Sequence, residues 1–231
     1  MKILSLYCRG CGKAGTVPEL RNLMEQHHPD LLFLMETRMG KQRIEELQWQ
    51  LGFPLGLHVK AEGRSGGIAL FWHRGIKVRR QTLNKSHIDV MVNDQVTQEE
   101  WRLTGFYGEP KRKNRRDSWY LLRYLRRQFK MPWICLGDFN EILSEDEYFG
   151  ACERAEWQMA GFRDTVNFVV SRTWVTVVFH TPGITNKKVY VMLKHGLTGP
   201  LSMRILLAYL RPRLCTIYRL QYQIIVLFLW T

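Results

Sequence analysis

Residues 169–231 of this 231-residue chain contain no aspartate and no glutamate, and all 21 acidic residues lie before them. The same segment carries eight lysines and arginines, so it supplies +8 of the formal net charge of +13. A soluble surface normally mixes charges of both signs. Because most of the charge comes from a segment of abnormal composition, the basic net charge is weak support for a nucleic-acid partner.

Cysteine pairs and long apolar runs are also lacking. The five cysteines are odd in number and show no repeated spacing, which argues against a disulfide framework. Cys8 and Cys11 form a single CxxC motif, without the second pair or the thioredoxin-like setting that a zinc or redox site needs. The apolar stretch before Arg9 is too short for a secretory signal, and residues 224–230 are far fewer than the ~20 of a membrane-spanning helix. We therefore expect an intracellular protein that is not secreted and has no membrane partner.

The first 168 residues alternate short apolar strands with amphipathic helices, which predicts a layered α/β domain. Hydrophobic residues make up 45% of the chain and charged residues 24%, the balance of a globular domain. Thr16 and Glu19 stand at the spacing of a capping box and indicate where the first helix begins. Beyond residue 168 the apolar residues keep neither a period of two nor one of 3.6, and no order of elements is predicted. The expected strands are residues 2–7, 31–35, 68–72, 78–83, 87–92, 101–107 and 133–136, and the later helices are 44–51, 116–129 and 155–168.

Polar side chains follow three of these apolar strands. Glu36 follows one strand, and Asp138 and Asn140 follow another. Strand ends are where a layered α/β protein exposes reactive groups, and a carboxylate there is a natural ligand for a hard cation such as Mg²⁺. Side chains alternate along an extended segment, so we expect Asp138 and Asn140 on one side, where they can activate a water and hold a phosphate oxygen. Tyr107 closes a third strand and adds a phenol donor; the alternative is that these are solvated strand-end and turn residues.

Five motifs in order resemble the endonuclease/exonuclease/phosphatase superfamily over residues 1–168. The match is closest to the apurinic-endonuclease-like domain at the head of plant LINE-type retrotransposon polyproteins. The motifs are LSLYCRG (residues 4–10), FLMET (33–37), GGIA (66–69), GFYGEP (105–110) and WICLGDFNEIL (133–143).

The resemblance implies a four-layer α/β sandwich, two packed sheets flanked by helices, here incomplete at the C-terminus. It implies cleavage of DNA phosphodiesters with Mg²⁺ or Mn²⁺, no small-molecule cofactor and action in the nucleus, although no targeting signal is present. Glu36 would bind the metal and Tyr107 would contact the scissile phosphate. Asp138 would help to generate the nucleophilic water, and Asn140 would orient the phosphate.

Two departures from the family pattern argue that catalysis is lost. Tyr7 replaces the family's N-terminal asparagine, and a phenol is bulkier and offers no amide carbonyl. The family's closing R-L-D-R and S-D-H segments are also missing, and His180 and His195 stand in unrelated contexts.

A shifted reading frame explains the abnormal tail. Read one nucleotide out of register, permissive codons for residues 172–185 can spell D-L-G-Y-S-G-L-P-Y-T-W-D-N, as the family continues. Residues 195–199 can spell R-L-D-R-A, and residues 222–225 can spell S-D-H. We therefore expect an endonuclease-like domain in residues 1–168 and an aberrant, poorly ordered tail, derived from a frameshift, in residues 169–231.

Three rival functions remain open. A nucleic-acid-binding remnant without catalysis is favoured by the basic run 111–116 and the helix after it, where Trp119 and Tyr120 interleave with the charges. The same run is more typical of a solvated helix face. A pseudogene product that never folds stably is the second rival. A phosphatase of the same superfamily is the third, and the closeness of the retrotransposon match makes it minor.

Overall fold

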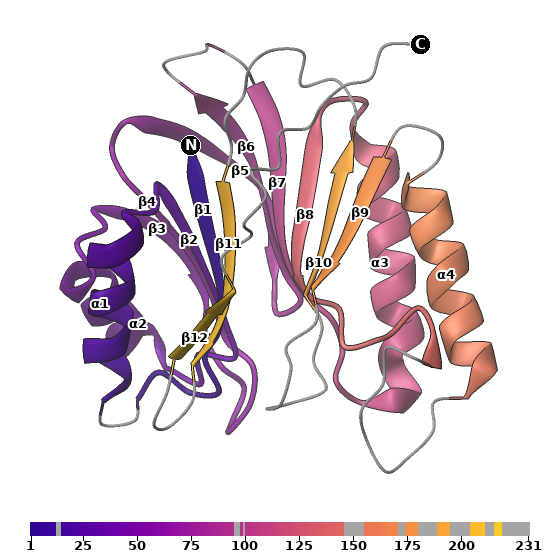
Figure 1. The fold of residues 1–231 in the computed structure, drawn as a ribbon, viewed down its shortest axis with the longest axis horizontal. Helices are drawn as coiled ribbons and strands as arrows, with labels where there is room; N and C mark the ends of the chain where they lie inside the picture. The colour runs from indigo at the N-terminus through magenta and orange to yellow at the C-terminus, as the bar shows by residue number, and fades with distance from the viewer. Residues whose placement is uncertain are drawn as a thin grey trace.

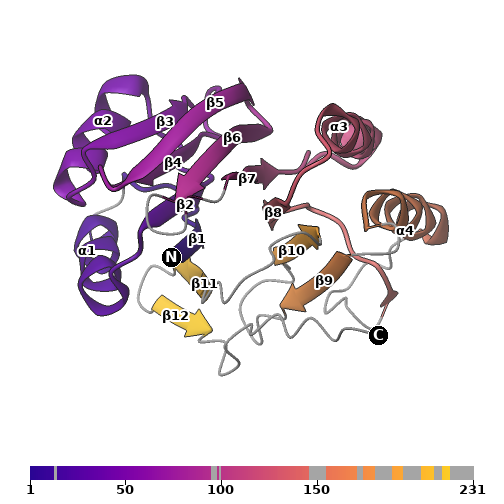
Figure 2. The same cartoon turned by 90° about the horizontal axis from the view of Figure 1, so that it is seen from above.

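Two six-stranded sheets pack face to face in the computed structural model, with helices on both outer sides (Figures 1 and 2). The structure describes residues 1–12, 15–94, 98, 100–145, 155–170, 174–179, 189–194, 204–210 and 215–218. The first sheet has the order β12-β11-β1-β2-β4-β3, and the second has the order β5-β6-β7-β8-β10-β9. The predicted four-layer α/β sandwich is confirmed.

Every element expected in the first 168 residues is present within a few residues of its expected bounds, and one strand, Leu55–Val59, was not expected. The first sheet comprises β1 (Lys2–Tyr7), β2 (Leu31–Met35), β3 (Leu55–Val59), β4 (Ile68–Trp72), β11 (Arg204–Leu210) and β12 (Cys215–Tyr218). The second comprises β5 (Ile76–Asn84), β6 (His87–Asp94), β7 (Glu100–Tyr107), β8 (Trp133–Asp138), β9 (Trp174–Phe179) and β10 (Val189–Lys194). The helices are α1 (Thr16–His27), α2 (Lys41–Gln50), the 3-10 turn η1 (Arg112–Asn114), α3 (Arg115–Gln128) and α4 (Glu156–Val170).

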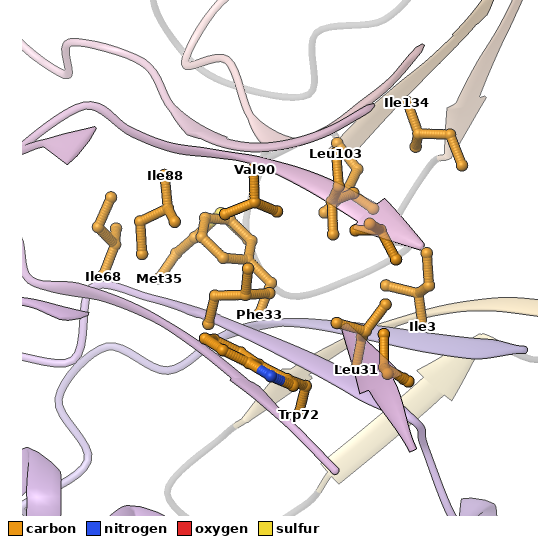
Figure 3. Close-up of a cluster of buried hydrophobic side chains, with 14 of the residues drawn as sticks. Ile3, Leu31, Phe33, Met35, Ile68, Trp72, Ile88, Val90, Leu103 and Ile134 are labelled. Carbon is orange, nitrogen blue, oxygen red and sulfur yellow. The ribbon is translucent and has the colours of Figure 1, made fainter. Parts of the chain in front are cut away.

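The main core lies between the two sheets. Phe33 and Met35 from β2 point toward Val90 and Leu103 of the second sheet, and all four side chains are fully buried (Figure 3). All five residues of β2 are buried, because the second sheet covers one face of this strand and the helices cover the other. Each large apolar side chain buried in this way contributes roughly 1.5–3 kcal/mol.

A buried ion pair joins the second sheet to α3. The guanidinium of Arg102 donates to both carboxylate oxygens of Asp89, at 2.8 and 2.9 Å, and to the carbonyl oxygen of Leu125 at 2.6 Å. Thr104 Oγ1 donates to Asp89 Oδ1 at 2.5 Å and accepts the indole N–H of Trp133 at 2.7 Å. Asp89 and Arg102 are each 1% exposed. The carboxylate and the guanidinium thus satisfy each other inside the protein, as buried charges require.

The start of α1 differs from the expectation. Gly15, with φ at 93°, is the residue before the first helical turn, and its carbonyl oxygen accepts the N–H of Glu19 at 3.1 Å. Thr16 is already helical and no side chain caps this end, so the predicted capping box is wrong. The physical reason is that a threonine caps only from the position before the helix, where its hydroxyl faces the free N–H groups.

Beyond residue 168, where no order of elements was predicted, the described residues include the four strands β9 to β12. β11 pairs with β1 in parallel, and β10 pairs antiparallel with β8. Segments of the tail therefore extend each sheet, and β-branched residues such as Val175 and Val177 suit the strand β9. The origin of the tail in a shifted frame stays a prediction.

Candidate functional site

Glu36 directly follows β2 and adopts a left-handed backbone conformation, with φ at 55°. A non-glycine residue held there costs about 1–3 kcal/mol, so the surrounding contacts must hold it in place. Arg38 Nε donates to Glu36 Oε1 at 2.8 Å, and the backbone N–H of Gly66 donates to Oε2, also at 2.8 Å. Gly66 itself has φ at 76°, which explains the need for glycine at this point of the GGIA motif. The Glu36 carboxylate is 3% exposed and is held by partners on both of its oxygens.

Tyr107, at the end of β7, reaches across from the second sheet to the same carboxylate. Its hydroxyl donates to Glu36 Oε2 at 2.7 Å. The centroids of the Tyr107 and Tyr7 rings lie 6.4 Å apart, so Tyr7 stands beside this contact. Burial first, then the neighbouring Tyr7 and the hydrogen bond to Glu36, raise the pKa of Tyr107 well above its ordinary value. The phenol therefore stays neutral and acts as a hydrogen-bond donor.

Asp138 ends β8 and lies opposite Tyr107 in the parallel pairing of β7 with β8. Gly137 precedes it with φ at 143°, and a Cβ at Gly137 would collide with the carbonyl oxygen of Phe106. Only glycine lets the two strands approach this closely, and the approach sets Asp138 beside Tyr107. Asp138 is 1% exposed.

Asn140 does not continue an extended strand, as was expected. Its φ is 55°, so the chain turns after Asp138. The Asn140 N–H donates to Asp138 Oδ1 at 2.9 Å, and its side-chain amide donates to the carbonyl oxygen of Gly108 at 2.7 Å. The expectation of two side chains on one side of an extended segment is wrong, because this turn closes on the end of β7 instead.

The four predicted residues therefore gather at one edge of the sandwich. Glu36 and Tyr107 are in direct contact, and Asp138 and Asn140 form a second hydrogen-bonded unit next to Tyr107. Sequence reasoning missed Arg38, which pairs with Glu36. The available signal was a cation two residues after the acid.

A divalent metal ion does not fit the described side chains as they lie. No group of three or more histidine, cysteine, aspartate or glutamate residues that could hold a metal occurs among the described residues. Hard cations need several oxygen ligands, and both oxygens of Glu36 already accept hydrogen bonds. The guanidinium of Arg38 holds a positive charge against this carboxylate, where a cation would otherwise bind. Whether Glu36 binds a metal stays a prediction.

A groove of about 140 Å³ opens beside this edge, bordered by Gly66 and Tyr107. Three lysines line it: Lys60, Lys85 and Lys111. Lys85 lies 3.8 Å from the carboxylate of Glu62, another lining residue. The carboxylates of Glu62 and Glu109 line the groove as well, so three ammonium groups and two carboxylates leave the lining only slightly positive.

Several solved structures share the fold of this chain. Among solved structures, the chain is similar to AP endonuclease LMAP from Leishmania major, at 13% identity over 83% of this chain and 87% of that one, with a TM-score of 0.57. The chain is also similar to an AP endonuclease from Archaeoglobus fulgidus, at 11% identity over 82% of this chain and 85% of that one, with a TM-score of 0.55. The 3′ phosphatase NExo from Neisseria, bound to a product DNA hairpin, gives 11% identity over 84% and 86%, with a TM-score of 0.55.

At these identities the solved structures establish the fold alone. No curated protein sequence matches the chain significantly. No helix among the described residues is long and apolar enough to cross a membrane. The sequence profile of the Endonuclease/Exonuclease/phosphatase family matches residues 9–191, which is most of the chain. The chain therefore belongs to the Endonuclease/Exonuclease/phosphatase family.

Proposed function

We propose that this chain is by descent a DNA phosphodiester-cleaving endonuclease domain of the LINE retrotransposon kind, and that its catalysis is lost. The proposal keeps the roles that the resemblance implies: Glu36 for the metal, Tyr107 and Asn140 for the phosphate, and Asp138 for the water. In this chain they are relics of those roles.

The hydrogen bonding of Glu36 is the observation that carries the proposal. Its carboxylate accepts bonds from Arg38, Gly66 and Tyr107, all between 2.7 and 2.8 Å. A catalytic metal would have to displace the Arg38 guanidinium and the phenol of Tyr107 before it reached the oxygens. The same contacts that order the edge therefore oppose metal binding.

Two sequence features support the loss of activity. Tyr7 occupies the place of an asparagine and lies beside Tyr107, with ring planes tilted by 42°. The second feature is the absence, anywhere in the chain, of a histidine preceded directly by an aspartate, the pair that the family uses at the phosphate. Both features remove polar groups that hold a phosphodiester for attack.

The substrate of the ancestral enzyme, on this proposal, was DNA. A Neisseria 3′ phosphatase with the same fold was solved with a product DNA hairpin, and the groove beside Tyr107 is lined by three lysines against two glutamates. These observations support DNA as the ancestral substrate of the edge.

Nicking of supercoiled plasmid DNA tests the proposal. The full chain is assayed with Mg²⁺ and separately with Mn²⁺, beside a Glu36→Gln variant purified in the same way. We expect both proteins to leave the plasmid intact. Nicking by the wild-type chain that Glu36→Gln abolishes would overturn the loss of catalysis, because a contaminating nuclease would survive the substitution.

The frameshift origin has its own test. The transcript across the Phe168 codon is sequenced and compared with genomic DNA and with related intact copies. A one-base gain or loss near this codon supports the proposal, and an unshifted coding sequence in the source DNA refutes it.

A further inference from the structure

Helices α3 and α4 pack side by side and form the outer layer beyond the second sheet (Figures 1 and 2). Trp119, one of the two aromatics singled out in the sequence, is buried here and not exposed. A Cβ at Gly161 of α4 would lie 2.6 Å from the Trp119 ring, so the two helices are in close contact at this point. Leu122 and Phe162 bury the inner faces of the same pair. The outward faces of the two helices therefore form one fixed surface.

Exposed aromatic rings are concentrated on that surface. Tyr120 and Tyr124 of α3 are 68% and 55% exposed, and four residues apart they lie on the same side of the helix. Trp157 and Phe168 of α4 are 51% and 37% exposed. Four of the six large hydrophobic side chains that the described residues expose thus stand on this one helix pair. Scattered exposed rings need no explanation, but rings gathered on one face indicate a binding surface.

Arginines lie over the two rings of α4. The guanidiniums of Arg112 and Arg116 stand 6.0 and 5.2 Å from the centroid of the Trp157 ring. Those of Arg123 and Arg127 stand 5.6 and 5.2 Å from the Phe168 ring. Four of the five arginines of α3 lie outside the core (Arg116, Arg123, Arg126 and Arg127), whereas Arg115 is buried and pairs with Glu141. The face is therefore both strongly basic and aromatic.

We infer that the outward face of α3 and α4 binds single-stranded nucleic acid. Tyr120 and Tyr124 offer flat surfaces on which unpaired bases stack. The arginines that lie over Trp157 and Phe168 stand beside these rings and meet the phosphates. Charge alone would suit any polyanion, but a duplex hides the faces of its bases and gives these rings nothing to stack on. An acidic peptide likewise matches the charge and leaves the rings unused. The combination of both features selects the single strand.

This inference does not rest on cleavage at the strand ends. The face lies on the outer side of the second sheet, whereas Glu36, Tyr107 and Asp138 lie at the ends of strands. No metal ion takes part in stacking or in arginine–phosphate contacts. Nucleic-acid binding by the face of α3 and α4 therefore does not depend on catalysis at the strand-end residues.

Fluorescence anisotropy with a labelled oligothymidylate tests the inference, in buffer with a chelator so that no cleavage occurs. The same strand annealed to its complement is the duplex probe. The test variant is Tyr120→Ala/Tyr124→Ala, and the matched control is Trp49→Ala, an exposed ring (67%) on α2 at the opposite side of the molecule. Both variants are checked by thermal melting to retain the fold.

We expect the wild-type chain to bind the single strand more tightly than the duplex. The double tyrosine variant should bind it at least about tenfold more weakly, because it loses two rings on which bases stack. Trp49→Ala should bind as the wild type does. Arg116→Gln/Arg127→Gln should also weaken binding and reduce its salt dependence. Equal affinity for duplex and single strand, no effect of the tyrosine substitutions, or an equal loss in Trp49→Ala would each overturn the inference.

Discussion

Two carboxylate–arginine pairs in this protein stand in opposite settings. Asp89 and Arg102 are both about 1% exposed, lie on neighbouring strands and share two hydrogen bonds. Glu36 is equally buried, but the side chain of its partner Arg38 is 44% exposed and gives one hydrogen bond. Both pairs neutralise a carboxylate, yet only the second has a partner that solvent can reach.

The difference teaches how a charge is used in this fold. The closed Asp89–Arg102 pair joins β6, β7 and α3, and its removal would leave a charge with no access to water. The open Glu36–Arg38 pair stands at the edge of the proposed relic site, and Arg38 can be hydrated when Glu36 changes. We therefore expect the first pair to control stability and the second to control what the edge can bind.

Asp89→Asn should have the largest effect, since it leaves the Arg102 guanidinium buried and unpaired. Breaking a buried pair in this way costs about 3–5 kcal/mol of the free energy of unfolding. Urea denaturation of the full chain measures this loss. The control Asp117→Asn changes an exposed carboxylate on α3 and should stay within about 0.5 kcal/mol. A loss below about 1 kcal/mol in Asp89→Asn would remove the distinction between the two pairs.

Glu36→Gln should lower the free energy of unfolding by less, about 1–2 kcal/mol. The glutamine amide oxygen still accepts hydrogen bonds from Gly66 and Tyr107, and water hydrates the guanidinium of Arg38. Urea denaturation again gives the number, with Glu25→Gln on the exposed face of α1 as its control. A loss as large as that of Asp89→Asn would mean that the open pair is as structural as the closed one.

Tyr107→Phe should have the smallest effect on the free energy of unfolding near neutral pH, a loss of about 1 kcal/mol for the one hydrogen bond that is removed. The raised pKa of Tyr107 in the folded state gives it a second signature. Its contribution is complete below the ordinary tyrosine pKa of about 10 and is lost as pH rises above that value, because the unfolded chain then releases a proton that the folded chain retains. The stability of Tyr107→Phe should therefore fall less steeply than that of the wild type above about pH 10. Parallel curves would contradict the burial of a neutral phenol at Tyr107, which is the main cause of its raised pKa.

Local sequence predicted the edge residues well because each follows an apolar strand. Glu36 follows a strand of five buried residues, and Tyr107 and Asp138 end strands of the same character. Runs of this kind are typical of strands covered on both faces, and the polar residue that ends the run is visible without any partner. The layered fold followed from the same alternation of strands and helices.

Contacts between distant segments were beyond the reach of the sequence. The hydrogen bond from Tyr107 to Glu36 joins residues 71 positions apart on different sheets, and it depends on how the sheets pack. The pairing of Asp89 with Arg102 depends on the register of β6 against β7, which no local pattern determines. The turn at Asn140 was only the alternative in the sequence analysis, because an Asp–x–Asn pattern fits a strand and a turn equally well.

Binding of Mn²⁺ to the full chain, followed by the electron paramagnetic resonance signal of the free ion, tests the central claim most directly. The wild type is titrated beside Glu36→Gln. Our account predicts that neither protein takes up Mn²⁺ at this edge, because Arg38 and Tyr107 occupy the Glu36 carboxylate. Uptake of one Mn²⁺ per wild-type chain that Glu36→Gln abolishes would contradict it and would show that the metal site has survived.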